Sequence, residues 1–337
     1  CSALYELGGM TVMHDPSGCN STYNTHDEIR WYDQDSLIYI SGLTEIDAIM
    51  GNDEKFLNDI MDAARELKPR FIALAGSPIP YMNGTDFPAL AEVLEQELGI
   101  PTFSVPTNGM HDYVYGAGLA LEQIARQFVP AKAVCEEKNI QPHTVNLLGV
   151  TPLDFGAYSR AGYMKKNLEK CGWKVLSTWA MGDDLEVLSH ALEAEVNLVV
   201  SSVGLRTAKY LEKEFGTPYE VGYPFVDELI PELGYERKKI LIIHQQVIAN
   251  AIRQEIRTRS DEQNTEVTVA SWFMMKSELS EEGDLSLKEE MDYCKLVQNG
   301  NYDIVFADEN MRGLVPGFKG TFVNIRHFAV SGKLQES

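Results

Sequence analysis

The feature that most constrains the fold is an alternation of apolar, strand-forming runs with helical patterns along the 337-residue chain. Runs at 70–76 and 102–105 alternate with helical spacing at 87–98. The same alternation recurs from 144 to 215 and again from 238 to 324. Strands that alternate with helices are typical of a parallel α/β sheet. The sequence therefore predicts an α/β protein with three consecutive parallel-sheet units of about 100 residues each.

Two segments separate the predicted units. Segment 129–142 contains prolines near both ends and mixed charge, and segment 224–237 begins with proline and is also charged. Such segments are typical of links between domains. We therefore expect domains at 1–130, 131–225 and 226–337, which agrees with the two or three domains that this length predicts.

Composition excludes some classes of protein. The net charge is −21 and 44% of the residues are hydrophobic, so the chain can bury a core but offers a poor surface for nucleic acid. No apolar run approaches the roughly 20 residues that span a bilayer, and no signal-peptide pattern opens the chain. Five cysteines are too few for a disulfide framework and favour a reducing cytoplasm. Because the chain begins at Cys1 rather than methionine, we expect further residues upstream.

The first 31 residues contain the strongest candidate site. Cys1 and Cys19 lie 18 positions apart, joined by a helix-like segment that ends in glycine. Cys19 closes a tight turn in which Pro16 fixes φ and Gly18 permits positive φ. Thiolates presented from short, constrained loops suit a soft metal or an iron–sulfur cluster. The alternative is a pair of buried free thiols, since cysteine is commonly buried.

Loops at the carboxyl ends of parallel strands are where such sheets bind ligands. None of the loops after the predicted strands contains GxGxxG, and GxxxxGK(S/T) occurs nowhere. The chain is therefore expected neither to hydrolyse nucleotide nor to bind a dinucleotide in the ordinary way. If the reaction needs ATP, another protein must supply it.

The turn at Cys19 and a later segment together resemble a known family. His14, Pro16, Gly18 and Cys19 match its His-Gly-Pro-x-Gly-Cys turn, with Asp15 in place of the glycine. Glu45, Asp47 and Gly51 match its Glu-x-Asp-x-x-x-Gly segment. The chain thus resembles the nitrogenase component 1 superfamily, which includes the light-independent protochlorophyllide reductases and cofactor-assembly scaffolds. The resemblance implies three Rossmann-like domains, a cluster between two subunits and a separate ATP-dependent iron–sulfur reductase.

By this resemblance Cys1 and Cys19 correspond to the first two cluster cysteines. The place of the third is held by Ser77, so one chain lacks the thiolates for a complete site. Two chains would bring four thiolates together, the ligand set of a [4Fe–4S] cluster. We therefore expect a homodimer, or a heterodimer with a homologous chain. Asp15 or Asp27 could instead donate an oxygen, but four thiolates are favoured because carboxylate ligation of such clusters is uncommon.

The ligands of nitrogenase's catalytic cofactor have no clear counterparts. The resemblance places its cysteine near Ser201 and Ser202, and its histidine near Arg326 and His327. We therefore do not expect dinitrogen reduction at a molybdenum-type cofactor. A smaller or different substrate cavity between the domains is expected instead.

Several residues near these loops are candidates for proton donors or substrate clamps: His14, His26, His111 and Arg326. His14 could equally pin the turn through a backbone carbonyl, and His111 could simply belong to a polar loop. His26, Asp27, Glu28 and Arg30 form a polar patch that is either a solvated loop with an internal ion pair or a substrate or interface group. Trp31 and Tyr32 could shield a cluster or merely pack.

The remaining cysteines and histidines carry weaker expectations. Cys135, Cys171 and Cys294 have no partner at ligand spacing and are expected to be inert packing thiols. His143 and His190 are expected on the surface, whereas His244 ends a strand at the ligand edge.

Two functions remain open from the sequence. The favoured one is a cytoplasmic reductase component that receives electrons from an ATP-dependent partner through a shared [4Fe–4S] cluster held by Cys1 and Cys19, with Asp15 and Ser77 beside it. The alternative is a non-catalytic scaffold that holds a precursor cluster, or a binding protein for a small anion.

Overall fold

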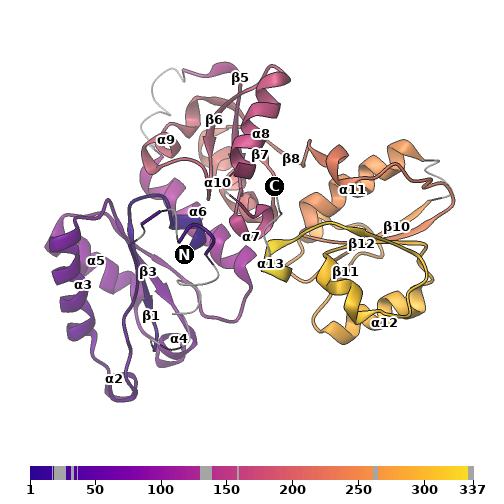
Figure 1. The fold of residues 1–337 in the computed structure, drawn as a ribbon. Coiled ribbons are helices and arrows are strands. Elements are labelled where there is room, and N and C mark those ends of the chain that lie inside the picture. The colour runs from indigo at the N-terminus through magenta and orange to yellow at the C-terminus, as the bar shows by residue number, and fades with distance from the viewer. Residues whose placement is uncertain are drawn as a thin grey trace.

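The computed structural model describes residues 1–16, 18, 28–31, 34–35, 37–129, 139–157, 159–260 and 265–332. The chain forms three parallel β-sheets with helices packed on them, and the three units surround a common centre (Figure 1). This confirms the predicted α/β class with three Rossmann-like sheets. The domain boundaries at 130 and 225 remain a proposal.

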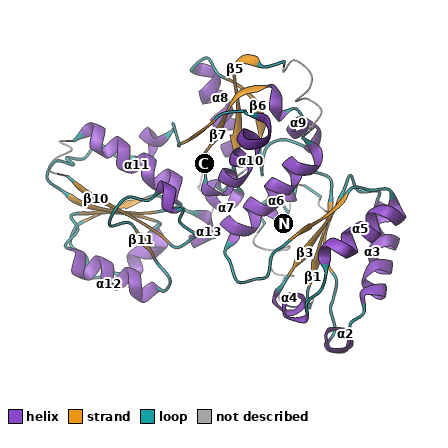
Figure 2. Cartoon of the chain, turned by 180° about the vertical axis from the view of Figure 1, so that it is seen from behind, coloured by secondary structure: helices purple, strands orange, loops and turns teal. Residues whose placement is uncertain are grey.

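The first unit has a four-stranded sheet in the order β2-β1-β3-β4, with every pair parallel. Helices α3 and α5 cover one face and α6 the other (Figure 2). Its strands are β1 (Met10–His14), β2 (Leu37–Ile40), β3 (Ile72–Gly76) and β4 (Thr102–Val105); its helices are α2 (Glu45–Met50), α3 (Asp53–Leu67), α4 (Pro78–Asn83), α5 (Phe87–Leu98) and α6 (Tyr113–Phe128).

Strand β1 corrects one sequence expectation. The segment between Cys1 and Cys19 was expected to be helix-like, but residues 1–14 contain a single 3₁₀ turn, η1 (Ser2–Leu4), and β1 follows it. Strand β1 lies between β2 and β3 and has Met10 and Val12 in the core on one face and Thr11 on the other. A strand covered on both faces shows no polar alternation, so its pattern does not distinguish it from a short helix.

The second unit has the strand order β6-β5-β7-β8, again all parallel. Gly149, directly after β5, has φ +88° and lies against Ser201, whose hydroxyl donates to the Gly149 carbonyl (2.8 Å). The elements are β5 (Gln141–Leu148), β6 (Lys174–Thr178), β7 (Ala194–Val199), β8 (Tyr219–Val221), α7 (Pro152–Phe155), α8 (Ser159–Lys170), α9 (Leu185–Ser189), η4 (Ala191–Glu193), η5 (Ser202–Gly204) and α10 (Leu205–Phe215).

The third unit is a five-stranded parallel sheet in the order β11-β10-β9-β12-β13. Its elements are β9 (Lys239–Ile243), β10 (Glu266–Ser271), β11 (Leu285–Ser286), β12 (Ile304–Ala307), β13 (Thr321–Asn324), α11 (Gln246–Arg259), α12 (Glu290–Gly300), α13 (Phe328–Ser331), η6 (Val226–Leu229), η7 (Ser277–Leu279) and η8 (Glu309–Leu314).

Hydrophobic packing crosses the boundaries between units. One buried cluster joins Phe71 and Phe103 of the first sheet through Leu121 of α6 to Leu211 of α10 in the second unit. Another joins the second and third sheets. The units therefore share core, and α6 belongs to two of them. No helix within the described ranges is long and apolar enough to cross a membrane.

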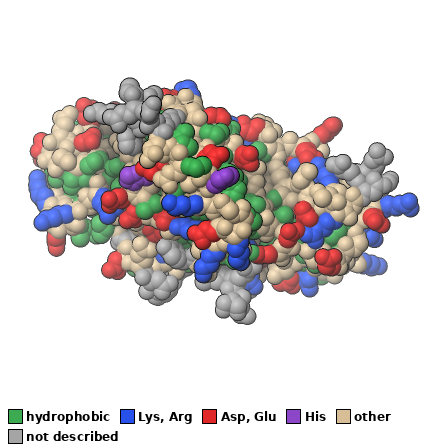
Figure 3. Space-filling view, turned by 90° about the horizontal axis from the view of Figure 1, so that it is seen from above, with side chains coloured by type: hydrophobic (Ala, Val, Ile, Leu, Met, Phe, Trp, Pro, Cys, Tyr) green, Lys and Arg blue, Asp and Glu red, His purple; other side chains and the backbone are tan. Residues whose placement is uncertain are grey.

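Acidic side chains outnumber basic ones on this chain, but they do not form a single block on the face seen from above. In that view acidic, basic and hydrophobic side chains are interspersed (Figure 3).

Candidate functional site

Each of the three sheets has a topological switch point. At this point the chain continues from one of two neighbouring strands towards one edge of the sheet, and from the other strand towards the opposite edge. These points lie between β1 and β3, between β5 and β7, and between β9 and β12. Ligands of open α/β sheets bind in the crevice beyond the carboxyl ends of the strands at such points. Asp15 and Ser77 occupy the first, Gly149 and Ser201 the second, and His244 and Asp308 the third, as the strand bounds show.

The first of these points opens into a cavity of about 530 Å³, which we call the Cys1 cavity. Strands β1, β3 and β4 form one wall and the first half of α6 another, while Cys1–Leu4 and the loops after the strands complete it. Gly76 is required here because a Cβ would lie 2.5 Å from the Thr107 carbonyl oxygen. The cavity brings together four predicted site residues: Cys1, Asp15, Ser77 and His111.

Polar contacts fix the residues beside Cys1. The Cys1 thiol lies 3.4 Å from the Met13 sulfur and is half-buried. Ser77 donates its hydroxyl to the His14 carbonyl (2.9 Å), and the Asp15 amide donates to the Ser41 hydroxyl (3.2 Å). The end of β1 is thereby tied to β3 and to the segment after β2.

His14 does not join this cavity. Its ring lies on the opposite face of the sheet, 4.1 Å from the Phe56 ring between centroids, and its Nδ1 is 2.8 Å from the Ser41 hydroxyl. Burial lowers the pKa of His14, and the nearby Asp53 and Asp15 only partly oppose that effect. The sequence assigned His14 either a structural or a proton-donating role, and this position favours the structural one.

His111 lies at the exposed end of the cavity. Its ring stacks on Tyr115 with 4.1 Å between centroids, and its Nδ1 is 3.2 Å from the Asn108 side-chain oxygen. A reachable imidazole in this place can donate or accept a proton at the edge of the cavity.

The polar patch after Cys19 is buried rather than solvated in its described part. Arg30 is 3% exposed and Glu28 is fully buried; the guanidinium donates to both Glu28 oxygens (2.7 and 2.8 Å) and to Glu6 (2.6 Å). It also donates to the carbonyls of Ser2 (2.8 Å) and Ala180 (3.2 Å), so it joins the N-terminal segment to the second unit. Trp31 is 40% exposed.

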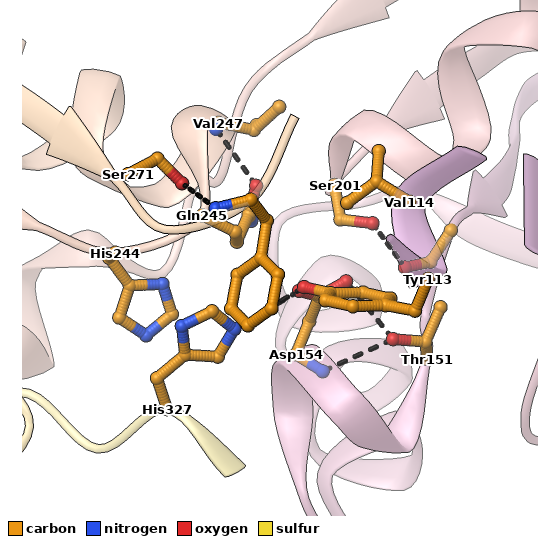
Figure 4. Close-up of polar contacts among 12 residues, drawn as sticks. Tyr113, Val114, Thr151, Asp154, Ser201, His244, Gln245, Val247, Ser271 and His327 are labelled. Atoms are coloured by element: carbon orange, nitrogen blue, oxygen red, sulfur yellow. Dashed lines mark hydrogen bonds and ion pairs between the residues drawn. The ribbon is translucent and has the colours of Figure 1, made fainter. Parts of the chain in front are cut away.

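A second buried polar cluster lies where the three units meet. The sequence pointed to two of its members, His244 and His327, but not to the cluster. Tyr113 from the first unit donates its hydroxyl to Asp154 of the second, and Asp154 lies 3.5 Å from His327 Nε2 of the third (Figure 4). The His327 ring stacks on His244 with 4.3 Å between centroids. We call these four residues the three-unit junction. Each of the four follows a strand, and His244 and His327 follow strands of the same third sheet. In the sequence Tyr113 lies 41 positions from Asp154 and 214 from His327.

Arg326 takes part in the three-unit junction through its backbone. Its carbonyl accepts a hydrogen bond from His244 Nε2 (3.1 Å), which leaves the other ring nitrogen of His244 buried without a partner among the described residues. Phe273 packs edge-on against both Tyr113 and His327, with 4.7 and 5.3 Å between ring centroids. The interior of the three-unit junction is therefore closely packed.

We expect His244 to make the protein sensitive to mild acid. Burial, and then the neighbouring His327, hold the pKa of His244 well below its usual value. The unfolded chain then binds one more proton below pH ~6.5, so the free energy of unfolding should fall by about 1.4 kcal/mol per pH unit between that pH and the folded pKa. His14 adds to the loss in the same direction.

Urea unfolding at pH 7.5 and 5.5 checks this expectation. His244→Gln, which does not titrate in this range, should lose a smaller part of its stability on acidification than the unaltered protein. An equal loss in both proteins would contradict the assignment.

Five residues that carried an expectation from the sequence lie outside the described residues, namely Cys19, His26, Asp27, Tyr32 and Cys135. Gly18, described, immediately precedes Cys19 in the sequence. Within the described ranges no group of three or more His, Cys, Asp and Glu side chains is arranged to hold a metal ion. Cys171 is exposed, and the thiol of Cys294 lies 3.3 Å from the Leu314 carbonyl.

A second apolar groove, of about 610 Å³, lies between the second and third units. Trp173, Leu198 and Val226 line it together with Ala251 of α11. The sequence led us to expect a substrate cavity between domains, and this groove lies in such a place, although none of its polar side chains is among the buried groups without a partner.

Known proteins are similar to this chain in sequence and in fold. The family model of nitrogenase component 1 type oxidoreductases matches residues 8–227. A light-independent protochlorophyllide reductase subunit from Nostoc punctiforme is 24% identical over 270 residues, which cover 78% of this chain and 51% of that protein. The corresponding protein from Staurastrum punctulatum is 28% identical over 236 residues, covering 66% and 44%. The chain thus spans about half the length of these curated relatives.

Solved structures agree on the architecture. A structure described as "Nitrogenase Cp1 at pH 6.5" superposes with a TM-score of 0.69 at 15% identity, covering 96% of this chain and 83% of that one. A second, described as "Nitrogenase Cp1 at pH 5", gives 0.69 at 14% identity, covering 99% and 84%. At this identity the likeness establishes the fold. The family model, which matches well over half of the sequence, establishes more: the chain belongs to the nitrogenase component 1 type oxidoreductases.

Proposed function

We propose that this chain is a nitrogenase-like reductase component that holds an iron–sulfur cluster between two subunits. Electrons would come from a separate ATP-dependent iron–sulfur reductase and pass to a small substrate. The observation that carries the proposal is the position of Cys1, whose half-buried thiol lies beside the end of β1, directly before the turn that leads to Cys19. Membership of the oxidoreductase family supports the redox class.

The cysteine donors of one chain fit a cluster that is shared between two chains better than a cluster that is held by one chain alone. Cys1 supplies one soft thiolate, and Cys19 is the other cysteine of the same segment. Ser77 donates its hydroxyl to the His14 carbonyl, so it serves as a brace, and Asp15 lies next to it. Two chains would provide the four thiolates of a [4Fe–4S] cluster, which supplies one-electron transfer at low potential when bound.

An exposed apolar surface supports a protein partner at the same end of the first unit. Ile46, Ile49 and Met50 of α2 and Tyr81 and Met82 of α4 are between 59% and 79% exposed. Asn83 of α4 donates to the Ala48 carbonyl (2.7 Å), which holds the two helices together. Helices α2 and α4 follow β2 and β3, so they lie at the carboxyl edge that carries Asp15 and Ser77. Grouped apolar side chains of this kind mark protein interfaces.

Iron analysis after anaerobic purification tests the proposal. Since four irons would be shared between two chains, we expect about two irons per chain and a cluster signal that changes on reduction. Cys1→Ser and Cys19→Ser should each abolish most of the bound iron. Cys294→Ser is the matched control, because that thiol contacts the Leu314 carbonyl in the third unit, and it should keep the iron.

The outcomes separate the two functions that the sequence left open. A cluster that stays bound and cycles on reduction supports the reductase. A cluster that is released to an acceptor protein supports the scaffold. Iron that is absent after reconstitution, or unchanged in both Cys1→Ser and Cys19→Ser, would refute a cluster at this site.

A further inference from the structure

The Cys1 cavity is large because small side chains line both of its long walls. Ala75 and Gly76 of β3 face Gly116, Ala117 and Ala120 of α6, and together they leave about 530 Å³ between sheet and helix. The cavity is partly open to solvent, and a cleft with mostly apolar walls at the switch point of a parallel sheet is a candidate ligand site. Its volume is in the range of pockets that bind small molecules.

One buried polar group in the cavity wall lacks a partner. Thr11 is 1% exposed and lines the cavity on the same face of β1 as Met13 and Asp15, and its hydroxyl makes no hydrogen bond with any described residue. Leaving a buried hydroxyl unpaired costs about 1–3 kcal/mol. Rotation of the side chain to another staggered position can turn this hydroxyl towards a bound molecule.

The other polar groups restrict the charge of that molecule. The Asp15 carboxyl is 6% exposed at the edge of the cavity, and no lysine or arginine from the described part of the chain lines it. A carboxylate or phosphate ligand would meet repulsion from Asp15 and find no lysine or arginine among the described residues there to pair with. The apolar walls and the Thr11 hydroxyl suit an uncharged molecule with an apolar body and one hydrogen-bond acceptor.

The packing of the three-unit junction makes this cavity the better substrate site. Tyr113, Phe273 and His327 are in contact with one another there. Tyr113 and Leu153 also line the Cys1 cavity, so its inner end lies against the three-unit junction. A molecule bound between sheet and α6 would lie beside the Cys1 thiol.

We propose that the Cys1 cavity binds a neutral, largely apolar molecule that carries a carbonyl-type acceptor, and that the Thr11 hydroxyl donates a hydrogen bond to it. This rests on the proposed function, since it names the substrate class of the same site. Binding itself needs no cluster, so it can be measured on iron-free protein. Failure of the iron analysis would therefore leave this test intact, and the reverse also holds.

The fluorescent ketone prodan is a suitable probe, because it has a neutral naphthalene body and one carbonyl and its emission shifts to the blue in apolar surroundings. Titration of the full chain should give saturable, blue-shifted emission. Ala117→Leu, which fills the cavity from α6, should lower the affinity at least tenfold. Ala251→Leu is the matched control: Ala251 is also a half-buried helix alanine, but it lines the groove between the second and third units.

Thr11→Val tests the hydrogen bond separately from the volume. We expect it to weaken 2-acetylnaphthalene, measured by displacement of prodan, by roughly three- to tenfold, the factor for one hydrogen bond. The affinity of 2-ethylnaphthalene, which has no acceptor, should be unchanged. Loss of prodan binding in Ala251→Leu but not in Ala117→Leu, or an equal effect of Thr11→Val on both naphthalenes, would overturn the proposal. Absence of saturable binding by the unaltered chain would also overturn it.

Discussion

Replacing Arg30 by methionine should lower the free energy of unfolding by about 3–5 kcal/mol, because it leaves buried carboxylates without their cation. The Glu6, Glu28 and Arg30 side chains are between 0% and 6% exposed. Burial opposes the charge of Arg30, but its hydrogen bonds with Glu28 and Glu6 outweigh that effect and raise its pKa. Methionine keeps much of the side-chain length, so the loss would reflect the charge and its five hydrogen bonds.

Urea unfolding followed by circular dichroism measures this loss. Arg30→Lys should be intermediate, because an ammonium keeps the charge but cannot contact both oxygens of Glu28 with a planar fork. Arg65→Met is the matched control: Arg65 pairs with Asp62 in an exposed (i, i+3) contact, for which less than about 1 kcal/mol is expected. A similar midpoint for Arg30→Met and Arg65→Met would contradict the role assigned to the buried pair.

Arg30 also shows what the sequence could not reveal. Its patch of neighbouring charges is equally compatible with a solvated loop, because charge patterning alone contains no information on partners from elsewhere in the chain. Two of those partners, Glu6 and the Ala180 carbonyl, lie 24 and 150 positions away. Burial of Arg30 follows from the packing of the N-terminal segment against the second unit, which no local pattern encodes.

The fold could be predicted from the sequence more easily than the burial of Arg30, because alternation between strands and helices is a local property. Strand β1 was missed, as were the short strands β8 and β11. Met10–His14 is covered by helices on both faces and therefore lacks alternating polar residues. Because β1 is a strand, its side chains alternate between the two faces of the sheet. This alternation places His14 and Thr11 on opposite faces. His14 lies on the α3 face, whereas Thr11 and Met13 lie on the α6 face with Cys1.

The sequence likewise predicted some residues of the candidate site and missed others. Ser77 and His111 directly follow a strand or lie in the next loop, so the rule that ligands bind at carboxyl ends found them, whereas Asp15 was found only through the resemblance of the turn at Cys19. Tyr113 and Asp154 are ordinary residues at helix starts, and nothing in their neighbourhoods signals that they meet His327. Thr11 was missed because its lone hydroxyl is significant only after its burial is known.

The three-unit junction connects one wall of the Cys1 cavity to the second and third units. Tyr113 begins α6, whose next turns line the cavity, and Leu153, adjacent to Asp154, lines it from the second unit. The Asp112 carboxylate accepts a hydrogen bond from the Met274 amide of the third unit, beside the same helix start. Anything that loosens the three-unit junction should therefore also loosen one wall of the cavity.

Asp154→Ala should have this effect and cost about 3–5 kcal/mol of stability. Asp154 is 1% exposed on its side chain; it accepts from the Tyr113 hydroxyl and from the Thr151 hydroxyl (3.0 Å), and it faces His327 Nε2 at 3.5 Å. Alanine would leave these three groups without their acceptor in a buried site. Hydrogen exchange measured by mass spectrometry should increase in peptides from the start of α6, from α7 and from 324–331, which belong to three different units.

Asp154→Asn is the matched variant, because asparagine keeps the shape and one acceptor oxygen for Tyr113. It should retain most of the protection in α6 and lose less stability than Asp154→Ala. Asp62→Ala, at an exposed position on α3, is the second control. It should change the free energy of unfolding by no more than about 0.5 kcal/mol and should not change hydrogen exchange detectably. If Asp154→Ala accelerates exchange only in α7, the contact is local to the second unit, and the three units are held together by other contacts, such as their shared hydrophobic clusters.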